Sequence, residues 1–242
     1  MLLLVIVALL VVADRVGASV ADDKVAEQVA VQAEKKDIKL GQQPTAEITG
    51  FPFLTQVAAG RYDKVLVHMR DIQAQAYSVP KLDITATGVH AKAGEIMDGN
   101  AHITADRVDG TATIGWGYLQ QTAKDQLKQK VQVDDLTLTG TGDKLTVHMT
   151  VPVLQQQIKV VGSAKLALSD DGHDVVVSVQ DLKPDGVDLP SYAQQALNGL
   201  AQQLTVRIAL PELPYGLKLT GIDPASDGLK VTATASDVAL AG

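Results

Sequence analysis

The sequence predicts an α+β protein in which amphipathic helices lie on a long, mainly antiparallel sheet. Valine and threonine recur with a period of two over much of the chain, which favours strands. Polar, Gly-containing turns separate successive apolar runs and favour antiparallel pairing with one face buried. Three stretches have helical spacing instead. We expect a single domain over residues 19–242, preceded by a separate segment over residues 1–18.

The first thirteen residues are uninterruptedly apolar and end at Asp14-Arg15. A signal-peptide core needs about 7–15 apolar residues and a bilayer span about 20, so the segment fits a signal peptide better. Val16-Gly17-Ala18 is a weak cleavage site. With several residues added, the segment would serve as an uncleaved membrane anchor, and a buried first strand or helix is the third reading. The favoured prediction is export through a membrane, with the protein either anchored or secreted.

Helical spacing appears in three places. Ser19 and Asp22 resemble a capping box that opens a helix over residues 20–36, and Lys35-Lys36 suits its C-terminal turn. Apolar residues recur every four positions over residues 116–129 and again over 190–204, where Pro190 suits a helix start. All three segments are expected to lie on the sheet.

Strands are expected wherever apolar and polar residues alternate after Ile48. Two polar turns, residues 170–173 and 223–228, separate such runs and predict hairpins. The alternating pairs and triplets are Val65/Val67/Met69, Leu82/Ile84, Leu136/Leu138, Leu145/Val147/Met149, Leu166/Leu168, Val175/Val177/Val179, Leu217/Leu219 and Leu229/Val231.

Composition excludes several classes of function. The net charge is −7, the isoelectric point is about 5.1 and no Lys/Arg cluster occurs, so no nucleic acid is expected as a partner. The chain has no cysteine, which excludes disulfides, thiolate metal sites and a Cys nucleophile. No histidine pair has zinc-protease spacing and no phosphate-binding Gly loop occurs. His68 and His148 fall opposite the apolar faces of their strands, where we expect them to be solvated.

We therefore predict no catalytic residue, no metal and no cofactor, and a protein that is not an enzyme. Asp170, Asp171, His173 and Asp174 have side chains that can ligate a cation, but they also suit the tight turn that the Gly172 position predicts. The turn is the commoner explanation of such a cluster.

Both phenylalanines of the chain occur in one short stretch, Gly50-Phe51-Pro52-Phe53-Leu54-Thr55-Gln56. Large apolar side chains in a Gly/Pro-kinked turn either fill a core or contact an apolar partner. The bulk of the apolar residues are aliphatic, so three helices on the sheet either pack into a filled core or leave a gap between the layers. Composition leaves both alternatives open.

This stretch and its surroundings resemble the LmeA-like phospholipid-binding family of actinobacteria. The resemblance rests on Asp14-Arg15-Val16-Gly17-Ala18, the helix that follows, the segment from Ile48 to Asp63 and the segment from Val65 to Ile72. It implies a tubular lipid-binding type of fold, in which a strongly curved antiparallel sheet wraps a long helix and encloses an elongated apolar cavity. It also implies that anionic phospholipid is the partner, at a membrane surface, and in mycobacterial relatives a link to mannolipid elongation.

On this reading the protein is a lipid carrier or a factor in envelope biogenesis. Val25, Val29, Leu197 and Leu200 are predicted to face the cavity. Phe51, Phe53 and Leu54 are predicted to form its mouth or a membrane-contacting turn, with Arg61 nearby to meet a phosphate. Two alternatives stay open for these residues: the Phe pair as a plug against the first helix, and Arg61 as a solvated turn residue. The rival functions are a non-catalytic structural or interaction module with a filled core, and an accessory enzyme of glycolipid synthesis. The sequence leaves the oligomeric state undetermined.

Overall fold

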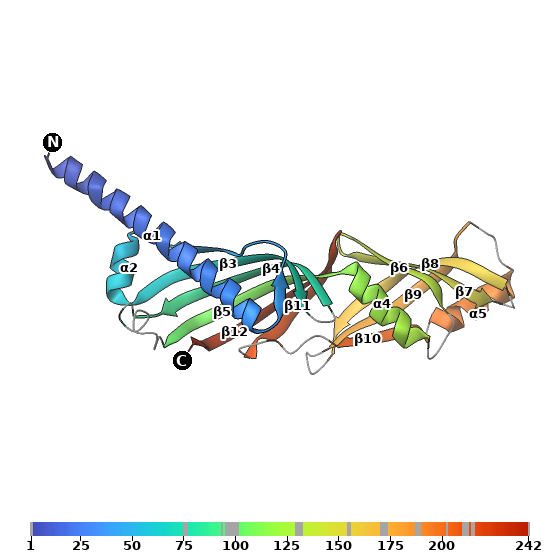
Figure 1. Cartoon of the computed structure of the whole chain (residues 1–242). Coiled ribbons are helices and arrows are strands. Elements are labelled where there is room, and N and C mark those ends of the chain that lie inside the picture. The colour runs from blue at the N-terminus through green and yellow to red at the C-terminus, as the bar shows by residue number, and fades with distance from the viewer. Residues whose placement is uncertain are drawn as a thin grey trace. The chain divides into compact units, whose positions relative to one another are not determined.

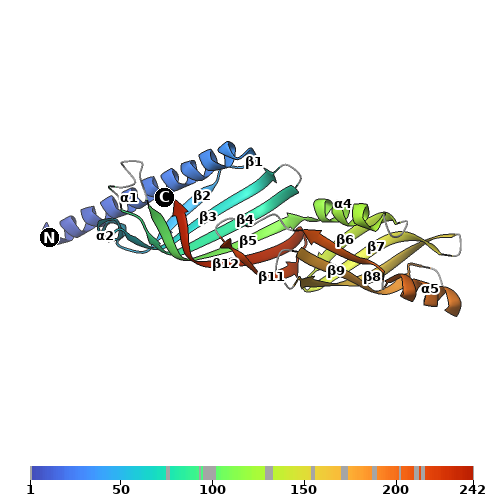
Figure 2. The same cartoon turned by 90° about the horizontal axis from the view of Figure 1, so that it is seen from below.

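The structure, a computed structural model, confirms the α+β class: antiparallel sheets accompanied by helices (Figures 1 and 2). It describes all residues except 1, 75–76, 93, 95–101, 129–132, 154–155, 170–173, 187–189, 202, 210–212, 214–215 and 242. The chain divides into two compact units. The first comprises Met1–Ala112, Leu213–Lys218 and Thr232–Gly242, and the second comprises Thr113–Glu212 and Leu219–Val231. The single lipid-binding domain expected over residues 19–242 stays a prediction.

The first unit combines a long helix with a sheet. Its helices are α1 (Leu2–Lys35) and α2 (Phe53–Ala59). The seven-stranded sheet has the order β1-β3-β4-β5-β12-β11, and β2 pairs with β3 as well. Its strands are β1 (Ile38–Leu40), β2 (Thr45–Thr49), β3 (Arg61–Ala74), β4 (Tyr77–His90), β5 (Ile103–Gly115), β11 (Lys218–Pro224) and β12 (Gly228–Ala241). Strands β5, β11 and β12 contribute residues to both units.

Within its described residues, the second unit has two helices and a five-stranded antiparallel sheet in the order β10-β9-β8-β7-β6. The helices α4 (Trp116–Leu127) and α5 (Ser191–Ala201) confirm the two predicted at residues 116–129 and 190–204. The strands are β6 (Asp134–Thr141), β7 (Lys144–Val153), β8 (Gln156–Leu168), β9 (Asp174–Pro184) and β10 (Thr205–Ala209).

The turns predicted between strands have different outcomes. Ala225 N donates a hydrogen bond to Gly228 O at 2.8 Å between β11 and β12, which confirms the hairpin turn at residues 223–228. Residues 170–173, the other predicted turn, lie outside the described residues. The strands on either side of them, β8 and β9, pair antiparallel.

The first helix begins much earlier than predicted. The sequence pattern placed its start at Val20, after a Ser19 cap, whereas α1 runs without a break from Leu2. No proline interrupts residues 2–35, and a lone glycine such as Gly17 costs a helix only about 1 kcal/mol. Asp22, the acidic partner of the expected capping box, instead accepts a hydrogen bond from Ile48 N at 2.7 Å. The capping-box prediction was therefore wrong.

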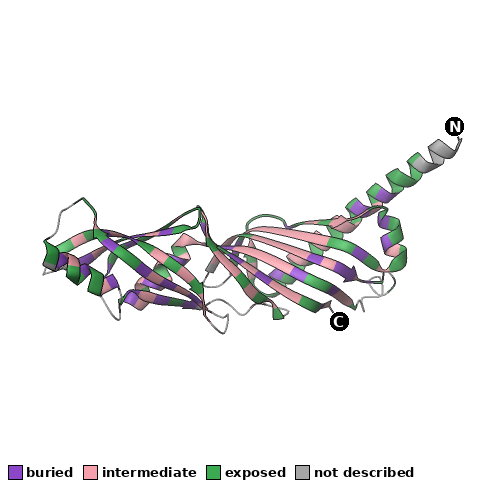
Figure 3. Ribbon diagram, turned by 180° about the vertical axis from the view of Figure 1, so that it is seen from behind, coloured by how far each residue is buried: buried purple, intermediate pink, exposed green. Residues whose placement is uncertain are grey.

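The cores of the two units differ in how completely they are packed. In the second unit the strands alternate between buried and less buried residues, as in β9, and the core is filled by side chains from both helices and the sheet. In the first unit every residue of β3 from Val65 to Arg70 is half-exposed, so neither face of the strand is fully covered there. Figure 3 shows this as continuous intermediate colouring on the strands nearest the N-terminal helix.

Candidate functional site

The turn between β2 and α2 is fixed by a glycine and a buried glutamine. Gly50 has φ +106°, and a Cβ there would lie 2.6 Å from Gln56 Nε2. The Gln56 side chain donates to Thr49 O at 3.2 Å and accepts from Asp63 N at 2.8 Å, so it joins the end of β2 to the start of β3. Only glycine combines that backbone conformation with that close approach. The turn therefore requires both Gly50 and Gln56, the first and last residues of the stretch that contains the two phenylalanines.

Phe53 is a plug between α2 and the first helix. It is 6% exposed, and its ring centroid lies 6.3 Å from that of Tyr62. Gly17 of α1 faces the ring, because a Cβ at Gly17 would lie 3.6 Å from Phe53 carbons. Asp14, 3% exposed, accepts a hydrogen bond from Leu54 N at 2.8 Å and so caps the first turn of α2 from the neighbouring helix. Phe53 thus occupies the position of the plug against the first helix that was one of the two alternatives for the phenylalanine pair.

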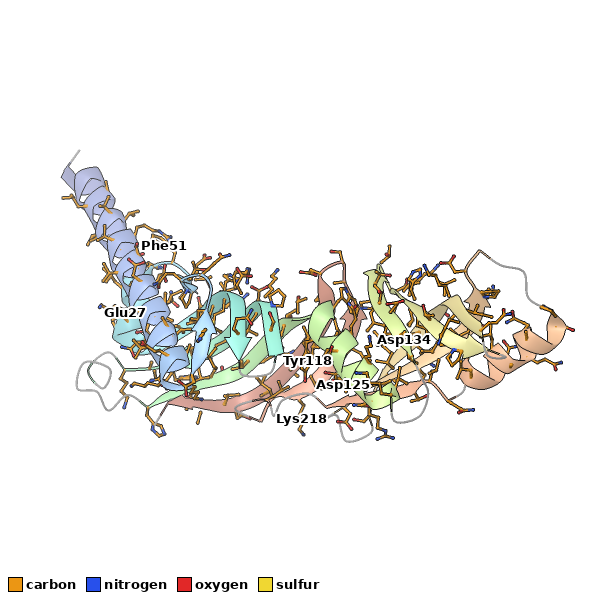
Figure 4. All side chains as sticks on the ribbon, turned by 45° about the vertical axis from the view of Figure 1, so that its right-hand side comes forward. Glu27, Phe51, Tyr118, Asp125, Asp134 and Lys218 are labelled. Atoms are coloured by element: carbon orange, nitrogen blue, oxygen red, sulfur yellow. The ribbon has the colours of Figure 1, made fainter. Side chains whose placement is uncertain are left out.

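Phe51 and Leu54 lie at the exposed edge of that core. They are 56% and 45% exposed, and the Arg15 guanidinium lies 4.8 Å from the Phe51 ring centroid in a cation–π contact. Figure 4 shows Phe51 beside α1. Large apolar residues of α1 are exposed as well, and together we call this set the apolar tip: Leu9, Leu10, Val11, Val12, Val16, Val20, Phe51 and Leu54. As far as the described residues go, none of the helices combines the length and the apolarity that crossing a bilayer requires.

One strip of α1 faces the protein, but its centre is incompletely covered. Its members recur every three or four residues and so share a helix face: Asp14, Ala18, Asp22, Val25, Val29 and Ala33. Ala18 and Ala33 are buried and Asp22 is tied to β2, so the strip is fixed along its length. The larger side chains between these anchors, Val25 and Val29, nevertheless stay half-exposed.

The sheet presents a continuous set of apolar side chains on one face. Register places Ile48 and Ala46 of β2 beside Val65 and Val67 of β3, and Ile84 and Leu82 of β4 beside Val67 and Met69. Because side chains alternate along a strand, all of these share one face. Each is half-exposed, and we call them the apolar sheet face: Ala46, Ile48, Val65, Val67, Met69, Leu82 and Ile84. Such a surface can bind an apolar ligand.

The opposite face of the same strands carries an ionic cluster around Asp83. His68 Nδ1, Arg70 Nη1 and Lys81 Nζ lie 2.7, 2.9 and 3.1 Å from its carboxylate oxygens. Partial burial raises the pKa of Asp83, but the hydrogen bonds with His68, Arg70 and Lys81 outweigh it and bring the pKa to about 2. His68 is therefore on the predicted face, but it is a half-buried partner of Asp83 and not a freely solvated side chain.

Arg61 begins β3 next to the Gly60 cap of α2. Its guanidinium lies 3.3 Å from Asp106 Oδ2, and both side chains are more than half exposed. His90 Nε2 lies 3.2 Å from the other oxygen of Asp106. An exposed pair of this kind contributes only about 0–1 kcal/mol, so Arg61 can exchange its partner at little cost.

The structure places the predicted site residues in two different units. Val25, Val29, Phe51, Phe53, Leu54 and Arg61 belong to the first unit, whereas Leu197 and Leu200 belong to α5 of the second. Leu197 is fully buried in the filled core and Leu200 packs against that core. The apolar sheet face, formed by alternating residues of β2, β3 and β4, was not among the predicted lipid-binding residues. The period of two in the sequence predicted the strands, but it does not show whether a second layer covers their apolar face.

A pocket in the second unit and possible metal-binding groups are the other candidate sites. A pocket of about 430 Å³ in the second unit is lined by residues of β7, β8, β9 and β11 and of the turn before β7, among them Lys144, Lys165, Asp143 and Asp223. None of the predicted site residues lines it. No group of three or more metal-ligating side chains occurs within the described part of the chain. The apolar sheet face and the apolar tip are thus the surfaces that a function has to explain.

Comparison with known proteins gives one match. The model of a family described as LmeA-like phospholipid-binding matches residues 12–234 of the 242-residue chain. No curated protein and no solved structure matches the chain significantly.

Proposed function

This chain belongs to the LmeA-like phospholipid-binding family, and from that membership we propose an exported envelope protein that holds anionic phospholipid. The acyl chains would lie on the apolar sheet face of the first unit, beneath Val25 and Val29 of α1. The protein would act by sheltering lipid, as a carrier or as a factor in envelope and mannolipid biogenesis, and not as an enzyme.

The observation that carries the proposal is the half-exposed state of the apolar sheet face. An antiparallel sheet in water normally buries its apolar face against a second layer. In the first unit α1 is held at Ala18, Asp22 and Ala33, yet Val25 and Val29 stay half-exposed, as do Val67 and Met69 on the sheet. Lipid chains are apolar and flexible, so they suit an aliphatic surface of this kind.

Sheltering of the acyl chains addresses the main obstacle to moving a phospholipid through water. Two chains hold about 30 methylenes, and each is worth roughly 0.8 kcal/mol on removal from water, so the barrier is on the order of 20 kcal/mol. An apolar protein surface replaces membrane hydrocarbon and lowers this barrier without any covalent step.

Arg61 is the proposed partner of the lipid phosphate. It lies at the start of β3, in the same unit as the apolar sheet face, and its present partner Asp106 is exposed. An arginine can bind phosphate through two parallel hydrogen bonds, which are stronger than its single contact with Asp106 at 3.3 Å. This supports a preference for an anionic head group.

The test is extraction of lipid from the purified full chain. We expect mass spectrometry of an organic extract to find phospholipid near one molecule per chain. Removal of that lipid followed by uptake of phosphatidylglycerol from mixed micelles should restore the same occupancy.

A matched pair of variants locates the site. Val67→Gln places an amide on the apolar sheet face, and Leu66→Gln places the same group on the opposite face of the same strand at a similarly half-exposed position. Burying an unpaired amide costs about 1–3 kcal/mol, so Val67→Gln should weaken uptake roughly tenfold. Leu66→Gln should leave uptake unchanged, and equal effects of the two variants would contradict the assignment.

A second candidate function is a structural or interaction module of the envelope. The observation in its favour is the filled core of the second unit, where Leu119, Leu197 and Leu204 are almost or fully inaccessible. Delipidated protein that takes up no phospholipid, together with an extract free of lipid, would favour this module over a lipid-binding protein.

A further inference from the structure

The residues around the weak cleavage site are part of the folded first unit. α1 continues through Val16-Gly17-Ala18 without interruption. Asp14 is buried and caps α2, Gly17 packs against the Phe53 ring, and Ala18 is a buried member of the core that contains Phe53 and Tyr62. Cleavage after Ala18 would therefore remove one wall of that core, the cap of α2 and the cation that covers Phe51.

The exposed apolar residues of α1 surround the helix and do not form a stripe. Leu9, Leu10, Val11 and Val12 are consecutive and all exposed. At 3.6 residues per turn, four consecutive residues span about 300° of the helix circumference. A protein groove covers one side of a helix, whereas a helix that is apolar on all sides requires surroundings that are apolar on all sides. A lipid bilayer provides such surroundings.

The other members of the apolar tip lie at the same end of the unit. Phe51 is held under Arg15, and Leu54 follows the Phe53 plug at the start of α2, where Asp14 binds its backbone. Asp14 and Arg15 end the uninterrupted apolar run, and Arg15 is the first exposed charged side chain after it. Arg15 can meet lipid phosphates while its stem lies along apolar surface.

We infer that the apolar segment is retained in the mature protein as an anchor inserted into the near leaflet of the membrane, and that Phe51 and Leu54 rest on the same bilayer. The inference decides between anchored and secreted forms and depends on the proposed function only for the location in the envelope. It places the apolar tip against the lipid from which the first unit would load.

The first experiment determines the N-terminus of the exported protein. The full chain with a C-terminal tag is produced in a bacterium that exports it, and the purified product is analysed by intact mass and by its membrane fractionation. We expect a chain that retains Asp14–Ala18, stays with membranes through carbonate washing and is released by detergent. A product that starts at Ser19 or later, or one released by carbonate, would overturn the inference.

The second experiment maps the membrane contact and uses the absence of cysteine from the chain. An environment-sensitive fluorophore is attached to Leu54→Cys or, as a control at an exposed position near the other end of α1, to Lys35→Cys. On addition of phosphatidylglycerol/phosphatidylcholine vesicles we expect a blue shift and quenching by spin-labelled lipid at position 54 only. The same response at both positions, or none at position 54, would contradict the contact.

Lipid occupancy measured on the same samples separates the two proposals. Val67→Gln should lower the phospholipid taken up from mixed micelles and leave carbonate-resistant membrane retention unchanged. Normal uptake by this variant would count against the lipid site on the apolar sheet face and leave the anchor standing, whereas a parent chain released by carbonate would count against the anchor alone.

Discussion

Asp14 connects the two helices of the first unit at the residue scale. Its Oδ1 accepts from Leu54 N, whereas its Oδ2 is buried without a partner among the described residues. Loss of a helix cap costs about 0.5–2 kcal/mol, and relief of the unpaired oxygen offsets part of that cost. We predict that Asp14→Ala lowers the free energy of unfolding by about 1 kcal/mol, as measured by urea denaturation in detergent.

The control for this variant is Asp23→Ala, at an exposed position on the same helix. It should change stability by less than about 0.5 kcal/mol, because exposed substitutions have small effects. Asp14→Asn, which keeps an acceptor for Leu54 N, should lie between the two. An Asp14→Ala effect no larger than that of Asp23→Ala would contradict the capping role.

The ion pairs of Asp83 lead to a prediction of how the stability of the protein depends on pH. Its pKa in the folded protein, about 2, lies below the ordinary value of 3.8, so its ion pairs contribute stability above pH ~4 and lose it as the pH falls towards 2. After allowance for solvent screening the contribution is roughly 1–2 kcal/mol. Denaturation of the parent and of Asp83→Asn should differ by that amount at pH 7 and converge near pH 2. A difference that does not change with pH would refute the ionic explanation.

The residue scale also shows what a sequence can say of a motif. The Gly50–Gln56 stretch was identifiable as unusual, but the roles of Phe51 and Phe53 were left as one unresolved choice. The structure divides them: Phe53 packs on Gly17 and Tyr62, whereas Phe51 is exposed under Arg15. That division depends on the path of the chain through the turn and on a helix some 35 residues away, and neither is encoded in the motif itself.

At the scale of elements, strand irregularities were invisible in the pattern. Four strands contain an aspartate with φ between 50° and 54°: Asp71 in β3, Asp135 in β6, Asp181 in β9 and Asp237 in β12. The strand registers shift near Asp135 and opposite Asp181, as β-bulges do, and bulges bend strands. Aspartate tolerates this conformation better than other non-glycine residues. Alternation predicts a strand but says nothing about such a bend.

Helix α1 provides the prediction at this scale. Val29 is half-exposed on the strip that faces the sheet, whereas Val31 is exposed and lies outside that strip. Val29→Trp should occupy part of the proposed lipid space and lower phospholipid uptake severalfold, with little change in stability. Val31→Trp should leave uptake at the parental level. Equal uptake by both variants in the micelle assay would place the acyl chains elsewhere.

For the whole molecule, the sequence indicated the fold class and the family but not the division into two units. The apolar alternation of Leu145/Val147/Met149 resembles that of Val65/Val67/Met69, yet the first set is buried and the second half-exposed. The difference comes from the layer that packs over each sheet, which strand periodicity does not describe. Helical spacing likewise does not show which layer covers a helix, so the sequence predicted that Leu197 and Leu200 face the same cavity as Val25 and Val29.

The filled core of the second unit leads to a contrasting prediction. Leu197 is fully inaccessible, and removal of a buried leucine side chain costs about 2–5 kcal/mol. Leu197→Ala should therefore lower the denaturation midpoint clearly while phospholipid uptake at low temperature, where the chain stays folded, remains normal. Lost uptake in the folded variant would transfer part of the lipid site to the second unit.

The central claim is that phospholipid acyl chains lie on the apolar sheet face of the first unit. The most direct measurement is photo-cross-linking with a phospholipid that carries a diazirine in its acyl chain, followed by peptide mapping of the full-length protein. We predict adducts on Val25 and Val29 of α1 and on Val67, Met69 and Leu82 of the sheet. Adducts confined to the second unit, or to Leu66 and Arg70 on the opposite face, would contradict the claim.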